Sequence, residues 1–97
     1  MTEPTIFIFR LYIADDTLNS RQAVANLRAI CNRLLPGRHK IELVDVFKEP
    51  DRALDDHIFM TPTLVKLEPA PVTRIVGTLS QVNVVLQVLG LEEPAAA

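Results

Sequence analysis

The strongest constraint on the fold is a change of hydrophobic period in the first half of the chain. Residues 5–13 are almost continuously β-branched or aromatic, which predicts a strand buried on both faces. An amphipathic helix follows, with apolar residues spaced by three and four: Ala23, Val24, Leu27, Ile30, Cys31, Leu34 and Leu35. Pro36-Gly37 ends it, and residues 41–46 predict a second strand. A strand, a crossover helix and a strand form a parallel, right-handed unit.

A proline motif in the second half narrows the fold further. Thr61-Pro62-Thr63 introduces an apolar strand from Leu64 to Leu67. After a strand–helix–strand unit, a thioredoxin-like domain presents the proline of its third strand in this way. Before it we expect a short helix opened by Pro50, and after it a proline-rich turn and a strand from Val72 to Val76.

The loop that would carry redox cysteines in such a domain contains none. Residues 14–20 read Ala-Asp-Asp-Thr-Leu-Asn-Ser, and Asn19 with Gln22 resembles a capping pair for the helix. The single cysteine, Cys31, lies deep in the predicted helix on its apolar stripe, where we expect a buried structural role. The scaffold therefore points to binding rather than catalysis.

Length and composition limit the remaining function classes. The 97 residues fit one small domain, which we expect over residues 1–91, with residues 92–97 as a flexible tail. The net charge is −2 and no basic run occurs, so nucleic acid is not an expected partner. The N-terminal apolar stretches are too short for a signal peptide or a membrane span. One cysteine excludes an internal disulfide, and we expect a cytoplasmic protein.

Other candidate chemistry has simpler explanations. His57 lies near three acidic residues, Asp51, Asp55 and Asp56, but their spacing does not form a zinc site. The pair Asp15-Asp16 is typical of helix-entry charges, and the three glycines do not form a phosphate-binding loop. We therefore expect no cofactor, no metal and no enzymatic activity.

The last apolar segment has two periods at once. A helical stripe is formed by Val82, Val85, Leu86 and Leu89. An alternating strand is formed equally well by Val82, Val84, Leu86 and Val88. The valines favour a strand and a cap at Ser80 favours a helix, so local sequence preference does not decide between strand and helix for this segment.

Several spaced motifs together resemble the KaiB circadian clock proteins. The resemblance runs from about Ile8 to Leu91 without an evident gap. The motifs are Leu11-Tyr12-Ile13-Ala14, Asn19-Ser20, Val44-Asp45-Val46 with Lys48 and Pro50, Thr61-Pro62-Thr63-Leu64 with Lys66, and Pro69-Ala70-Pro71-Val72 with Arg74-Ile75-Val76-Gly77 and Leu79-Ser80.

This resemblance implies a non-enzymatic clock or stress-signalling protein with two folds. One is a self-associated ground state, typically a tetramer. The other is a thioredoxin-like monomer that binds the N-terminal ATPase ring of KaiC, displaces a sensor histidine kinase whose N-terminal domain has the same fold, and helps to capture KaiA. We expect an α/β chain with a thioredoxin-like N-terminal half. From about residue 50 the C-terminal half adopts either arrangement, and crystals favour the ground state.

The resemblance also assigns residues. It places partner contact around Phe7, Lys40, Glu42 and His57. It places the change of fold in the segment that contains Pro62, Pro69, Pro71, Val88 and Gly90, where X-Pro bonds can change isomer slowly. Cyanobacterial members tend to have lysines where this chain has Glu42 and His57. The resemblance thus implies a divergent KaiB homologue, and we expect its KaiC-like partner to have a different surface.

Two other interpretations stay open. A thioredoxin-like redox or glutathione-dependent protein is disfavoured, because Ser20 at the helix start caps better than it attacks. A freestanding version of the kinase sensor domain would stay thioredoxin-like permanently, and it predicts neither a tetramer nor a second fold.

Overall fold

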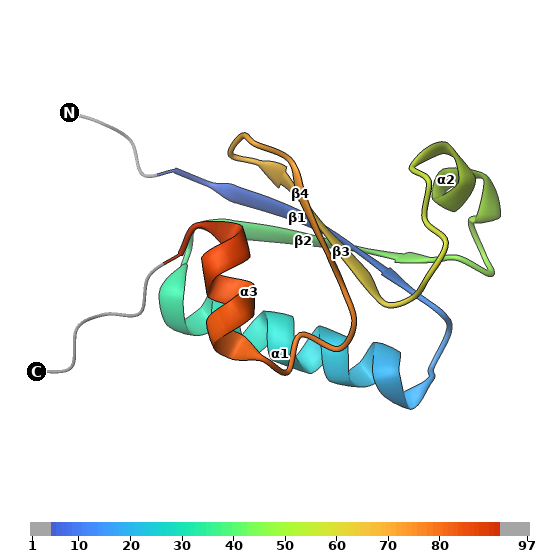
Figure 1. Ribbon diagram of the computed structural model, residues 1–97, viewed down its shortest axis with the longest axis horizontal. Coiled ribbons are helices and arrows are strands. Elements are labelled where there is room, and N and C mark those ends of the chain that lie inside the picture. The colour runs from blue at the N-terminus through green and yellow to red at the C-terminus, as the bar shows by residue number, and fades with distance from the viewer. Residues whose placement is uncertain (1–4, 92–97) are drawn as a thin grey trace, which may run out of the picture.

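The computed structural model describes residues 5–91, so the expected tail of residues 92–97 lies outside the described part. Seven elements follow one another along the chain (Figure 1). They are β1 (Phe7–Ile13), α1 (Leu18–Leu34), β2 (His39–Asp45), α2 (Pro50–Asp55), β3 (Thr63–Glu68), β4 (Thr73–Val76) and α3 (Val82–Leu89).

The four strands form one sheet in the order β2-β1-β3-β4. Strands β1 and β2 are parallel, with Phe7 beside His39 and Ile13 beside Asp45, which confirms the predicted parallel unit. Strand β3 is antiparallel to β1, and β4 is antiparallel to β3. The predicted α/β fold is confirmed, and the second half of the chain has the thioredoxin-like arrangement in this structure.

Side chains from the two faces of the sheet build two apolar clusters. Helices α1 and α3 cover one face (Figure 1), where Phe9, Leu11 and Leu27 have no exposed surface. Burying a side chain of this size stabilises the fold by roughly 1.5–3 kcal/mol. The second cluster lies on the opposite face, under α2, and contains Tyr12, Val44, Ala53, Ile58 and Val65.

Helix α1 begins earlier than the sequence indicated. Its cap is Thr17, whose side chain accepts a hydrogen bond from the Ser20 backbone N–H at 3.3 Å, so the prediction of Asn19 with Gln22 as the capping pair was wrong. The Ser20 hydroxyl is buried and accepts from the Ala14 backbone N–H at 3.0 Å and from the Thr17 hydroxyl at 2.8 Å. These bonds fix the loop between β1 and α1.

The ambiguous last segment is a helix, α3. Burial of Val85, Leu86 and Leu89 in the first cluster selects the helical period. Gly90 ends the helix in the left-handed region at φ 73°, which glycine adopts without steric cost. The N-terminal cap is Gln81 and it makes no side-chain hydrogen bond, so the predicted cap at Ser80 was one residue early.

The prolines of the second half flank β3. Pro62 precedes the strand, and its carbonyl accepts a hydrogen bond from the Gly77 backbone N–H at 2.9 Å. Pro69 and Pro71 lie in the turn between β3 and β4, and all three X-Pro bonds are cis. Within residues 5–91, no helix is long and apolar enough to cross a membrane.

Candidate partner-binding face

The face of the sheet under α2 carries Arg10 of β1, Lys40 and Glu42 of β2 and Arg74 of β4. In the β1–β2 register, Ile8 lies beside Lys40 and Arg10 beside Glu42. Because side chains alternate along a strand, these four point to the same face. On β3, Val65 pairs with Arg10 on one side and with Arg74 on the other, so one row of side chains crosses the sheet with a buried valine between the two arginines.

Glu42 ties this row to the short helix α2. Its Oε1 lies 2.8 Å from the Arg10 Nε and 2.9 Å from the Arg52 Nη2. Hydrogen bonds from Arg52 and then from Arg10 lower the pKa of Glu42 from 4.5 to about 2. Arg52 also reaches Glu49 at 3.3 Å. The side chain of Glu42 is 47% exposed, so solvent screens these pairs.

Asp56, directly after α2, makes the second set of contacts between this helix and the sheet. The Tyr12 hydroxyl donates to its Oδ2 at 2.8 Å, and the Arg74 Nη2 lies 2.9 Å from its Oδ1. The Arg10 Nη1 approaches the same carboxylate at 4.0 Å. Burial, followed by the hydrogen bond to Asp56, raises the pKa of Tyr12. We call the full set the α2 clamp: Arg10, Tyr12, Glu42, Arg52, Asp56 and Arg74.

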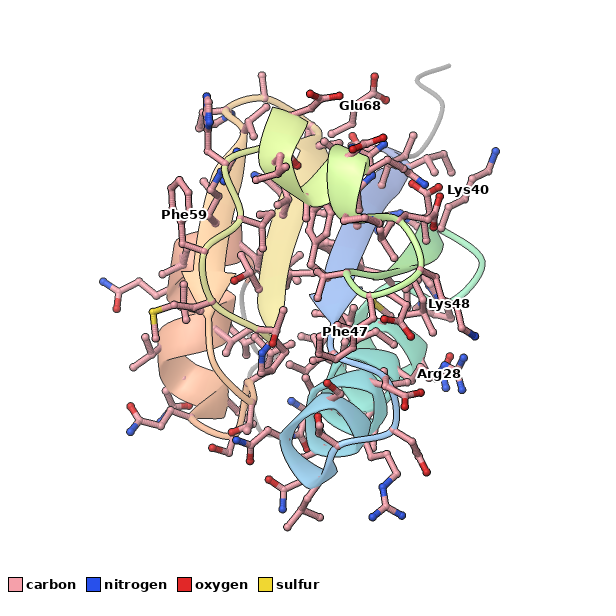
Figure 2. The ribbon with its side chains drawn as sticks, turned by 90° about the vertical axis from the view of Figure 1, so that its right-hand side faces the viewer. Arg28, Lys40, Phe47, Lys48, Phe59 and Glu68 are labelled. Atoms are coloured by element: carbon pink, nitrogen blue, oxygen red, sulfur yellow. The ribbon has the colours of Figure 1, made fainter. Side chains whose placement is uncertain are left out.

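The structure places the predicted contact residues apart: two lie at the β2 edge, His57 lies beside Phe59 toward β4, and Phe7 lies on the opposite face. Lys40 and Glu42 lie on β2 at the edge of the sheet, and Figure 2 shows Lys40 projecting outward there. His57 is exposed, follows α2 with φ 56°, and stacks on Phe59 with ring centroids 6.5 Å apart. Phe7 is different: it is 7% exposed and packs in the α1 cluster on the opposite face, beneath the Lys66 ammonium at 6.0 Å.

The residues assigned to the change of fold do not form one site. Pro62, Pro69 and Pro71 flank β3, whereas Val88 lies on α3 and Gly90 is its C-terminal cap.

Sequence reasoning missed most of the α2 clamp. The available signal was Arg10, a charge inside an otherwise apolar strand, which requires an acidic partner on that face of the sheet.

The loop between β1 and α1 offers no nucleophile for thiol chemistry. Cys31 has no exposed surface, and burial raises the pKa of its thiol to about 11. The Ser20 hydroxyl is occupied by its two hydrogen bonds. An open hollow of about 350 Å³ lies beside the loop, lined by Ile13, Val24 and Arg21 among others. Among residues 5–91, no group of three His, Cys, Asp or Glu could hold a metal ion.

Comparison with known proteins decides the family. The model of the KaiB domain matches residues 10–91. This chain belongs to the KaiB family. It is 41% identical over 85 residues to the circadian clock protein KaiB3 of Synechocystis sp., covering 88% of this chain and 81% of that protein. It is 42% identical over 86 residues to the circadian clock oscillator protein KaiB of Prochlorococcus marinus (strain MIT 9312), covering 89% and 80%.

Solved structures match the fold. The N-terminal domain of SasA from Synechococcus elongatus matches with a TM-score of 0.73 at 19% identity, covering 99% of this chain and 94% of that domain. Chloroplastic thioredoxin z matches with a TM-score of 0.69 at 21% identity, covering 88% and 80%. At these identities the matches show the thioredoxin-like fold alone.

Proposed function

We propose that this KaiB-family chain is a non-enzymatic interaction protein that binds the ring of a KaiC-like ATPase in its thioredoxin-like form. The observation that carries the proposal is the combination of a KaiB-family sequence with the fold of the SasA domain over almost the whole chain. On this proposal the bound chain competes with a sensor histidine kinase, because two domains of one fold can occupy one site.

The face under α2 is the proposed contact surface. Lys40 and His57 are exposed on it, and so are two large apolar side chains, Phe47 at 71% and Leu54 at 65%. Figure 2 shows Lys40 and Lys48 along one edge of the molecule and Phe47 nearer the middle of the view. Exposed apolar side chains on the same face as Lys40 fit an ATPase surface that has an apolar patch with acidic side chains beside it. Phe7 contributes to this face by packing behind β1 rather than by direct contact.

Co-elution of the full chain with a KaiC-like ATPase ring, with and without nucleotide, tests the proposal. Leu54→Asp should abolish the complex, because it places a charge in the apolar centre of the contact. Leu18→Asp is the matched control, since Leu18 is 62% exposed at the start of α1, away from α2. Added kinase sensor domain should displace the chain from the ring. Equal binding by both variants would contradict the assignment of this face.

The proposal extends to assembly and to further partners. In its ground-state arrangement the chain forms a tetramer, and in the bound state it helps to capture a KaiA-like protein.

A freestanding sensor-type domain is the second candidate, favoured by the 99% coverage against the SasA domain. Light scattering over a dilution series separates the two, because the sensor-type domain would not form a tetramer at any concentration.

The redox alternative has a direct test. Cys31 is buried with a raised pKa, so its thiolate is scarce at neutral pH. We expect no turnover above the buffer control in an insulin-reduction assay with dithiothreitol. Turnover that disappears in Cys31→Ala would restore the redox interpretation.

A further inference from the structure

Two polar side chains lie on the face of the sheet that α1 and α3 cover (Figure 1). In the sheet register, Lys66 of β3 lies between Phe9 of β1 and Thr73 of β4. Phe9 packs in the cluster under α1, and residues directly opposite each other on paired strands point to the same side. Lys66 and Thr73 therefore both point toward the larger apolar cluster.

The Lys66 ammonium lacks an acidic partner in the described part of the chain. The residue is only 4% exposed. Its Nζ lies 6.0 Å from the centroid of the Phe7 ring, the outer limit of a cation–π contact, and it makes no ion pair or hydrogen bond within residues 5–91. Glu68, two residues further along β3, is exposed and lies at the upper edge of the view in Figure 2. A charge that is buried to this extent is costly unless a counter-charge faces it.

Thr73 presents a second polar group without a partner, next to the first. Its Oγ1 is buried and has no hydrogen-bond partner, and no other buried side-chain nitrogen or oxygen within residues 5–91 is left in this way. Buried hydroxyls in proteins are nearly always hydrogen-bonded, so an unpaired one indicates a missing water or ligand. Because Lys66 and Thr73 are directly opposite, their Cβ atoms are about 5 Å apart, and one small group can reach both.

The chemistry of the two side chains selects a carboxylate. An ammonium and a hydroxyl can both donate, and an ionised carboxylate has two oxygens that only accept. One lysine neutralises one negative charge, whereas the second charge of a phosphate dianion would stay uncompensated beside the Phe7 and Phe9 rings. A water molecule would satisfy Thr73 but would leave the Lys66 ammonium without a counter-charge.

We propose that Lys66 and Thr73 form a binding site for one carboxylate on this face of the sheet, with the Phe7 ring as its apolar wall. The Lys66 ammonium and the Thr73 hydroxyl each donate to one oxygen of the bound group. An occupied site joins β1, β3 and β4 and stabilises their pairing. The site lies on the face opposite to the α2 clamp, so it does not rest on ATPase binding.

NMR titration of the full chain with sodium acetate, at an ionic strength held constant with sodium chloride, tests the site. The Nζ signal of Lys66 and the amide signal of Thr73 should shift and saturate, with a dissociation constant on the order of 1–10 mM for so small a ligand. Lys66→Met should abolish the response at Thr73, and Thr73→Val should weaken binding about three- to tenfold, because it removes one hydrogen bond. Arg28→Met is the control, since it removes an exposed cation of α1 that is not part of the site and should leave the titration unchanged.

Two sources can supply the carboxylate, and a double variant separates them. One source is a small organic acid from solution. The other is the chain itself, because Glu92 and Glu93 follow Leu91, which packs against the same cluster as Phe7. If the chain supplies the group, the Lys66 signal of the Glu92→Gln, Glu93→Gln variant should differ from the wild type before acetate is added, and acetate should then bind more tightly. If the group comes from solution, the double variant should titrate like the wild type.

Thermal unfolding provides a second measurement. In the double-variant background acetate should raise the Tm, because it binds the folded state, and the additional Lys66→Met change should remove this increase. Circular dichroism confirms that each variant is folded, and Thr73→Val carries the test if Lys66→Met does not fold. Three results would overturn the proposal: no response of Lys66 and Thr73 to acetate in either the wild type or the double variant, equal titration of Lys66→Met and Arg28→Met, or an equal rise in Tm with and without Lys66.

Discussion

At the scale of single residues, Glu42 combines a proposed role in partner contact with an observed role inside the chain. The resemblance identified it as a contact position where relatives tend to have lysine. The structure adds that its carboxylate binds both Arg10 and Arg52 inside the same chain. Its charge therefore affects the docking of α2 as well as the surface offered to a partner.

Glu42→Lys should have two measurable effects. The new ammonium would face Arg10 and Arg52, so the free energy of unfolding should fall by about 1 kcal/mol, the scale of exposed pairs. The added positive charge should also shift binding toward KaiC of the cyanobacterial type. Urea unfolding and titration with each ATPase measure the two effects. Glu42→Gln is the control, because it removes the pairs without reversing the charge. Unchanged affinity for both ATPases would argue against Glu42 as a contact.

The same carboxylate gives a pH dependence of known sign. The folded pKa of Glu42 is about 2, below its ordinary value of 4.5, so the folded state binds this proton less readily. The stabilisation is present above pH 4.5 and is lost as the pH falls toward 2. The difference in unfolding free energy between the wild type and Glu42→Gln should shrink over that interval. A difference that grows on acidification would show that the pairs do not form in solution.

At the scale of elements, tertiary contacts decide what local sequence leaves open. The period of the apolar residues predicted β1, α1 and β2, because a long regular stripe reports the buried face directly. The valine-rich segment of α3 has no such preference, and burial of Val85, Leu86 and Leu89 chose the helix. Beyond the signal at Arg10, the α2 clamp could not be predicted from the sequence, because Arg10 and Asp56 are far apart in the chain and meet only where α2 packs over the sheet.

The loop before α1 provides a test at this scale. The Ser20 hydroxyl is a buried acceptor for the Ala14 N–H and the Thr17 hydroxyl. Ser20→Ala leaves both donors without that partner, so we expect a loss of about 1–3 kcal/mol in unfolding free energy. Asn19→Ala, at an exposed position in the first turn, should change stability by less than about 0.5 kcal/mol. Thermal unfolding measures both, and equal shifts would show that the Ser20 bonds do not hold the loop.

At the scale of the whole molecule, the clamp joins the two halves of the chain. Arg10, Tyr12 and Glu42 come from the first half, and Arg52, Asp56 and Arg74 come from the second. A second arrangement of residues beyond about 50 would lose these contacts. On the proposal of two folds, their balance would depend on this surface network together with the core that α3 covers. A gap of a few kcal/mol between two packings is enough for both to be populated.

We expect NMR spectra of dilute protein to show two sets of peaks for residues 50–91, with their ratio shifted by the ATPase partner. Clamp variants such as Glu42→Gln should lower the thioredoxin-like fraction, because they weaken contacts of that arrangement. Leu18→Asp, outside the clamp, should leave the ratio unchanged. One unchanging set of peaks, with and without partner and over hours, would contradict the existence of a second fold.

The hydrogen bond between Tyr12 and Asp56 links the intrinsic fluorescence of the chain to the docking of α2. The sequence has one tyrosine and no tryptophan, so its intrinsic tyrosine emission comes from Tyr12 alone. A phenol that donates to a carboxylate emits weakly, because the excited ring passes its proton to the acceptor. Tyr12 donates to Asp56 in this way at 2.8 Å. Departure of α2 from the sheet would therefore brighten the protein, and its fluorescence would follow the docking of this helix in real time without any attached dye.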